Sequence, residues 1–157
     1  MVELSFPLRA AHIRRQLGRL CAMMGWAALH EVPLPNGRRA DLLALRGDGS
    51  FVCIEIKSGS RDFMMDRKWR EYDAYADALF FAVDLDFPLS LLPDDVGIIV
   101  ADSHGAEIIR PAQESRAMVP ARRRSLTLTY ARLAAGRLAA ALDPDLRSSL
   151  MAAHLVE

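Results

Sequence analysis

Three charges inside two apolar stretches constrain this chain more than any other feature of its sequence. Thirteen residues separate Asp41 from Glu55, and Lys57 follows two positions later. Asp41 opens the apolar run LLAL, whereas Glu55 and Lys57 interrupt the run FVCIEIK. Charged side chains are costly to bury unless another group compensates them. The pattern therefore predicts two strands that carry these charges to a site where a cation balances the carboxylates.

The segment between the two runs predicts how the charges meet. RGDGS is typical of a hairpin turn, so Asp41 should lie on the strand beside that of Glu55. Glu55 and Lys57 are two positions apart and should leave the same face of their strand. Adjacent carboxylates repel, and a divalent cation relieves the repulsion. Ligands that are all oxygen favour Mg²⁺ or Mn²⁺ over zinc.

Composition sets broad limits on the chain. The 157 residues have a formal net charge of zero and are half apolar, which predicts one globular domain over residues 1–157. Zero net charge gives no general attraction to nucleic acid, so any DNA-binding surface must be a local patch. Cys21 and Cys53 stand in apolar contexts and are expected to be reduced core residues. No segment has the length or pattern of a membrane span or signal peptide, and we expect a cytoplasmic protein.

The apolar periodicity predicts an α/β protein. Helices are expected over residues 8–24, from about residue 62 to 76, and over 125–142. Strands are expected around residues 26–34, 39–45, 51–58, 78–83, 97–102 and 106–111, with the first three in a meander and the last two in a hairpin. The inward residues predicted for the three helices are Leu17, Leu20, Cys21 and Met24; Met65, Trp69, Tyr72 and Ala76; and Leu126, Tyr130, Leu133 and Leu138. A solvated charged face is expected from Asp66, Arg70, Asp73 and Asp77.

Several longer segments carry a family resemblance. The chain contains HEVPLPNGRRAD, EIKS, DRKW, FFAV, LLPDDVGIIVAD and GAEI. With these segments it resembles the bacterial MmcB family of DNA repair proteins from about residue 8 to 138. The spacing D-x13-E-x-K also resembles the motif of the PD-(D/E)xK nuclease superfamily. That resemblance implies a restriction-endonuclease-like mixed sheet flanked by helices, with an αβββαβ core followed here by a C-terminal hairpin and helix. Ala40 departs from the proline that usually precedes the motif aspartate.

The superfamily resemblance also implies roles for individual residues. Asp41, Glu55 and Lys57 would be the catalytic residues, with the metal held by the two carboxylates and the main-chain carbonyl of Ile56. Many members add an acidic ligand from the first helix or first strand. The first helix offers no acid between residues 8 and 25, which leaves Glu31 on the first strand as the candidate.

Basic residues near this motif are candidates for DNA contacts. Arg38 and Arg39 directly precede the Asp41 strand, and Lys68 lies on the predicted second helix. All three could contact phosphate oxygens. The last helix and the apolar tail could also form a homodimer interface, since many superfamily nucleases pair to cut two strands. The tail residues concerned are Leu150, Met151 and Leu155.

Three functions remain open at the level of sequence. The first is a DNA repair protein that hydrolyses phosphodiester bonds as a Mg²⁺- or Mn²⁺-dependent nuclease. The second is a catalytically silent DNA-binding or adaptor module of the same fold. The third is an α/β domain unrelated to nucleic acid, in which Glu55 and Lys57 form an exposed pair that contributes little to stability.

Overall fold

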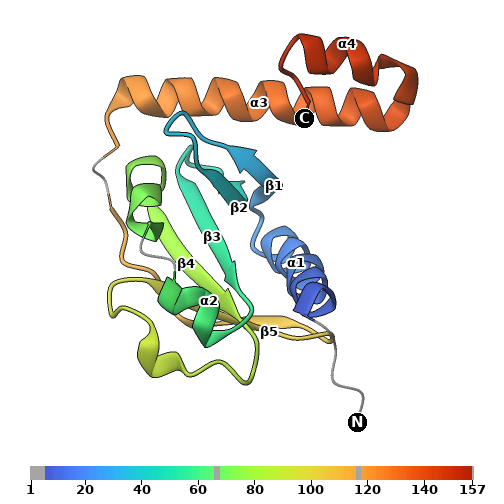
Figure 1. The fold of residues 1–157 in the computed structure, drawn as a ribbon. Coiled ribbons are helices and arrows are strands. Elements are labelled where there is room, and N and C mark those ends of the chain that lie inside the picture. The colour runs from blue at the N-terminus through green and yellow to red at the C-terminus, as the bar shows by residue number, and fades with distance from the viewer. Residues whose placement is uncertain (1–5, 66–67, 116–117, 157) are drawn as a thin grey trace. The chain divides into compact units, whose positions relative to one another are not determined.

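The computed structural model describes residues 6–65, 68–115 and 118–156. The chain forms two compact units, Met1–Met118 and Val119–Glu157. The first unit contains a single sheet of six strands with helices packed on it (Figure 1). Its elements in chain order are α1 Phe6–Met23, β1 Ala27–Pro33, β2 Arg39–Leu45, β3 Phe51–Lys57, α2 Ser60–Met65, the 3-10 helix η1 Trp69–Tyr75, β4 Ala78–Val83, the 3-10 helix η2 Leu89–Leu91, β5 Gly97–Ala101 and β6 Ala106–Arg110.

The strands lie in the order of the sequence, β1 to β6. Antiparallel pairing joins β1 to β2 and β2 to β3, so the predicted meander is confirmed. β3, β4 and β5 run parallel, and β6 returns antiparallel to β5 as the predicted hairpin. This mixed sheet, with the order α1, β1 to β3, α2, β4, confirms the predicted α/β class and agrees with a restriction-endonuclease-like core.

Helix α1 covers one face of the sheet with its apolar stripe. Ile13, Leu17 and Cys21 pack there against Leu42, Val52, Ile54 and other buried strand residues. Met24 was predicted inward but is 47% exposed, because α1 ends at Met23 and Gly25 turns the chain with a positive φ of 70°. Ile13, one helical turn before Leu17, belongs to the stripe in addition to the predicted residues.

The predicted second helix differs from the observed structure. In its place are the short helix α2 and the 3-10 helix η1. Trp69 and Tyr72 are buried as predicted, because residues three apart also share a side of a 3-10 helix. Asp77 is buried rather than solvated, with only 4% of its surface exposed. Asp66 and the side chain of Met65 lie outside the described part of the chain.

The second unit consists of α3 Pro120–Leu142, the 3-10 helix η3 Pro144–Leu146 and α4 Arg147–Ala152. α3 begins five residues earlier than predicted, since a proline is well suited to the first position of a helix. Leu138 was predicted inward but is 61% exposed, and Gly136 is buried instead. A Cβ on Gly136 would meet the Leu155 carbonyl oxygen at 2.0 Å, so the C-terminal tail packs directly on α3.

The prediction of a single domain over residues 1–157 stays a prediction. Of the helices in the described residues, none is long and apolar enough to cross a membrane.

Candidate active site

The motif residues meet where strands β2 and β3 stop pairing. The ladder between these strands ends at Leu42 and Ile54. Beyond that pair, the Asp41 carboxylate accepts a hydrogen bond from the main-chain N–H of Ile56 at 2.8 Å. The Glu55 carboxylate in turn accepts the main-chain N–H of Asp41 at 3.1 Å. Side chains thus replace the main-chain partners of a regular ladder, and the two carboxylates become neighbours. We call this site, where Asp41 of β2 meets Glu55 of β3, the β2–β3 fork.

The sheet register brings a third carboxylate to the same row. In the register of β1 with β2, His30 pairs with Leu42 and Val32 pairs with Ala40. Glu31 therefore falls opposite Asp41, which in turn falls opposite Glu55. Glu31 has a positive φ of 52° and interrupts the ladder at this pair. Such a backbone conformation is uncommon outside glycine, and it redirects the Glu31 side chain within the edge strand.

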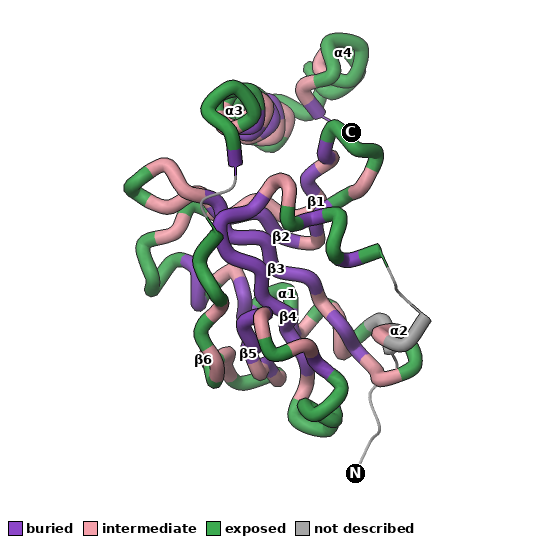
Figure 2. Tube along the Cα trace, turned by 90° about the vertical axis from the view of Figure 1, so that its left-hand side faces the viewer, coloured by how far each residue is buried: buried purple, intermediate pink, exposed green. Residues whose placement is uncertain are grey.

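Two of the three motif charges are buried. Glu55 is 4% exposed and Lys57 is 6% exposed. Figure 2 shows the buried stretch running along β3 at the centre of the sheet. This burial excludes the interpretation that the two residues form an exposed surface pair. A buried carboxylate beside a buried lysine costs desolvation free energy, which a fold does not need for its own stability.

The environment of Asp41 disfavours its charged form. Burial is the largest cause that raises the pKa of its carboxyl above the ordinary value, and the charge of Glu31 raises it further. The Ile56 N–H and the positive charges of Lys57 and Arg14 act in the opposite direction. Because desolvation prevails, the fork would gain from a cation that stabilises the ionised carboxylate.

Glu31 is held by two arginines. Its carboxylate accepts Arg14 of α1 at 2.5 Å and contacts Arg39 of β2 at 2.7 Å. Arg14 was missed from the sequence, since only the packing of α1 on the sheet brings it to the fork. The one signal for it was a first helix with arginines in place of the acid expected from the superfamily. Glu31 would bind a metal only by leaving these partners, and its role as a ligand stays a prediction.

The predicted DNA-contacting residues have different surroundings. Arg38 binds Glu71 of η1 through two nitrogens, at 2.6 and 3.3 Å. Arg39 keeps 61% of its side chain exposed, and its main-chain carbonyl accepts the Tyr72 hydroxyl at 3.2 Å. Lys68 is exposed and directly precedes η1. Arg39 therefore lies near the fork through its contact with Glu31, whereas Arg38 binds Glu71 of η1.

The donor set at the fork suits a hard divalent cation. Carboxylate oxygens from Asp41 and Glu55, with the carbonyl of Ile56, are the ligands that Mg²⁺ and Mn²⁺ accept. Across residues 6–65, 68–115 and 118–156, however, no three His, Cys, Asp or Glu side chains are grouped so that they could hold a metal ion. A cation at the fork would therefore have two carboxylates as its protein side-chain ligands, with solvent or substrate completing the shell.

The two cysteines are buried and free, as predicted. Burial raises the pKa of Cys21 to about 11, and burial followed by the charge of Glu55 raises the pKa of Cys53 well above its ordinary value. The Cys53 sulfur lies 3.9 Å from a carboxylate oxygen of Glu55. Both are therefore neutral thiols, and Cys53 is a weak donor to Glu55 rather than a nucleophile.

Comparison with known proteins gives one family and two solved structures. The family model described as "DNA repair protein MmcB-like" matches residues 3–145. A solved protein of unknown function from Silicibacter pomeroyi is 37% identical, with a TM-score of 0.80 over 92% of this chain and 96% of that one. A repair endonuclease from Pyrococcus abyssi matches at 17% identity with a TM-score of 0.30, over 56% of this chain and 39% of that one. No protein with curated annotation matches.

Proposed function

We propose that this chain, which belongs to the family of MmcB-like DNA repair proteins, is a metal-dependent nuclease that hydrolyses phosphodiester bonds in DNA. The observation that carries the proposal is the β2–β3 fork, where Asp41 and Glu55 are neighbours and Lys57 is buried beside them. A fold has no need to bury these charges at the point where two strands part. A metal site of the PD-(D/E)xK kind accounts for all three.

Each residue then has a defined task. Asp41 and Glu55 would hold Mg²⁺ or Mn²⁺, which when bound would activate water and stabilise charge on the leaving oxygen. The Ile56 N–H orients the Asp41 carboxylate through its 2.8 Å hydrogen bond. Lys57, kept from solvent by its burial, would orient the attacking water and counter charge on the scissile phosphate. Arg39 would contact a neighbouring phosphate once it leaves Glu31.

A specific observation favours a second candidate, a catalytically silent DNA-binding or adaptor module. The Glu31 carboxylate is already balanced by Arg14 and Arg39. The fork therefore has two acidic ligands, where many members of the superfamily have three. A protein that has lost hydrolysis but kept DNA binding would look the same at Glu31.

Cleavage assays separate the two candidates. The purified chain is incubated with branched, nicked, single-stranded and duplex DNA in Mg²⁺, in Mn²⁺ and in EDTA. Asp41→Asn and Lys57→Met test the fork, and Asp86→Asn, an exposed aspartate on the loop after β4, is the matched control. Metal-dependent cleavage that both fork variants lose and the control keeps is the expected result. DNA binding with no cleavage of any substrate would move the assignment to the silent module.

A further inference from the structure

Helix α1 carries an unbalanced positive charge. Over its 18 residues it has four arginines and a histidine and no acidic residue. Arg9 pairs with Asp84 at 3.4 Å and Arg14 with Glu31. Arg15 and Arg19 are exposed, and neither forms an ion pair with a residue in the described part of the chain. In a protein of zero net charge, α1 is therefore a cationic surface.

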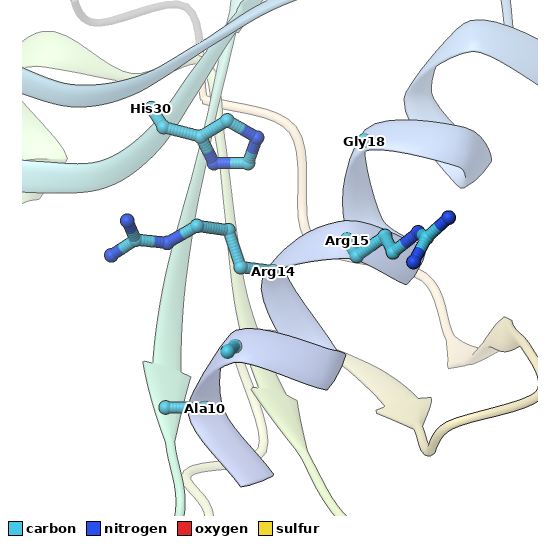
Figure 3. Close-up of a pocket in the computed structure, with 6 residues that line it drawn as sticks. Ala10, Arg14, Arg15, Gly18 and His30 are labelled. Carbon is cyan, nitrogen blue, oxygen red and sulfur yellow. The ribbon is translucent and has the colours of Figure 1, made fainter. Parts of the chain in front are cut away.

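Two hollows lie along this surface and share Arg15. The first has a volume of about 460 Å³ and is lined by Ala10, Ala11, Arg14, Arg15, Gly18 and His30. The second, of about 230 Å³, is lined by His12, Arg15, Gln16, Arg19 and Ser103. Figure 3 shows Arg14 and Arg15 pointing in different directions from α1, with the His30 ring facing the helix. Arg15 stands between the two hollows, and we call the pair together the α1 groove.

The second hollow has a buried, hydrogen-bonded side chain in its wall. Gln16 is 6% exposed, and its side-chain amide donates to the Ser103 carbonyl at 2.9 Å. This bond ties α1 to the turn between β5 and β6. Arg15 and Arg19 stand one helical turn apart, about 6 Å along the axis, on either side of this anchor.

The charge of the α1 groove contrasts with that of another hollow in the same unit. A hollow of about 610 Å³ beside β5 and β6 is lined by Asp84, Asp102 and Glu107 and, in the described part of the chain, by no lysine or arginine. Among the described residues, the α1 groove is lined by three arginines and by no acid. Of these hollows, the α1 groove is the one that arginines line, and its charge favours an anion.

The first hollow borders a residue that contacts Glu31. Arg14 lines it and also binds Glu31, and its positive charge acts on Asp41. A ligand in the first hollow would therefore lie beside Arg14 and its partner Glu31, on the face of the sheet that α1 covers. Two neighbouring hollows with a cation at several points suit an extended anion with repeated charges better than a single phosphate.

We propose that the α1 groove holds the phosphodiester backbone of the nucleic acid, with Arg15 and Arg19 as phosphate contacts and Arg14 at the end nearest the fork. The proposal rests on the proposed function only in that the ligand is a nucleic acid. It assigns DNA contacts to α1, in addition to those predicted for Arg38, Arg39 and Lys68.

The salt dependence of binding tests the groove. Affinity for a fluorescent duplex is measured by anisotropy in EDTA, from low to physiological salt, for the wild type and Arg15→Ala/Arg19→Ala. The control is Arg132→Ala/Arg147→Ala, which removes the same two charges from exposed positions on α3 and α4. Loss of two phosphate contacts should lower the slope of log K against log salt by about 1.8 and weaken binding on the order of tenfold, whereas the control should keep the wild-type slope.

Two outcomes would overturn the proposal: a wild-type slope in the α1 variant, or an equal loss in both variants, which would reflect net charge alone. Arg15→Gln/Arg19→Gln keeps the aliphatic stems and repeats the test if the alanine variant does not fold. Inorganic phosphate is added as a competitor, and displacement of the duplex at low millimolar phosphate would show a single-anion pocket and also overturn it.

The failure of this proposal can be told from that of the nuclease proposal. If the α1 variant changes the slope but no metal supports cleavage, the groove proposal stands and the nuclease proposal fails. If the protein cleaves DNA with metal but the α1 variant keeps the wild-type slope, the nuclease proposal stands and the groove proposal fails.

Discussion

The two ends of strand β3 carry the same hydrogen bond in two different settings. At its start, the Asp77 carboxylate accepts the main-chain N–H of Phe51 at 2.7 Å. At its end, the Asp41 carboxylate accepts the N–H of Ile56 at 2.8 Å. The first bond joins β3 to an aspartate just before β4, and the second joins it to an aspartate within β2. Each satisfies a main-chain donor that lacks a partner in the ladder.

The surroundings of the two aspartates differ. The main chain of Asp77 also donates to Phe51 at 2.8 Å and accepts from Ser115 at 2.6 Å, so this residue closes a backbone junction. Asp41 instead faces Glu55, with Lys57 buried nearby and Glu31 opposite. The structural task is complete at Asp77 with one carboxylate. The fork holds more charge than the same task requires, and this excess is what indicates chemistry.

The largest difference between the two ends should appear in cleavage. Asp41→Asn keeps an acceptor for the Ile56 N–H but removes a charged ligand, so we expect at least about a 100-fold loss of metal-dependent cleavage. Asp77→Asn should leave cleavage per folded molecule at the wild-type rate. Rates are compared by single-turnover assays on the best substrate, and equal losses in the two variants would break the distinction.

Stability should show the reverse order. Asp77→Ala leaves the buried Phe51 N–H without its acceptor and should lower the free energy of unfolding by about 3 kcal/mol. Asp77→Asn, which keeps an acceptor, should cost less, and Asp41→Asn less again. Urea denaturation followed by circular dichroism gives the three values. A larger loss at Asp41→Asn than at Asp77→Ala would mean that the fork is chiefly a structural element.

Lys57 should act on the ionisation of the fork. Its positive charge lowers the pKa of Asp41 against the opposing effect of burial. In Lys57→Met that pKa should rise further, so Mn²⁺ binding should require a higher pH than in the wild type. Mn²⁺ titrations at a series of acidic pH values give the midpoint, which is the pH at which Mn²⁺ binding is half of its maximum. An unchanged midpoint would place the Lys57 ammonium too far from the carboxylates to serve them.

The smallest expected effect is on the pH dependence of the free energy of unfolding in the absence of metal. The folded-state pKa of Asp41 is raised above its unfolded value, so protonation favours the folded state. This contribution is complete below the ordinary carboxyl pKa and is lost as pH rises through the raised one. The stability of the wild type relative to Asp41→Asn should therefore fall as pH rises over this window. A difference that increases with pH would contradict the assigned direction.

The sequence was sufficient to predict the meander and the meeting of Asp41 with Glu55. Both follow from local pattern, since the RGDGS turn sets the register of the hairpin. It did not predict that side chains replace the ladder beyond Leu42 and Ile54, because strand separation depends on the whole sheet.

Long-range packing set the remaining features of the site. The ion pairs of Glu31 with Arg14 and Arg39 depend on how α1 lies on the sheet and on the positive φ at Glu31. The burial of Asp77 was missed for a related reason. Helical periodicity placed it on a charged face, but η1 ends at Tyr75 and Asp77 lies just before β4, where it binds Phe51.

Calorimetric titration of Mn²⁺ into the wild type, Asp41→Asn and Asp77→Asn tests the central claim most directly. The claim is that the carboxylates of the β2–β3 fork form a metal site. The wild type and Asp77→Asn should bind one Mn²⁺ with similar affinity, and Asp41→Asn should bind at least about tenfold more weakly. Equal affinity in Asp41→Asn and the wild type, or no binding by the wild type, would contradict the claim.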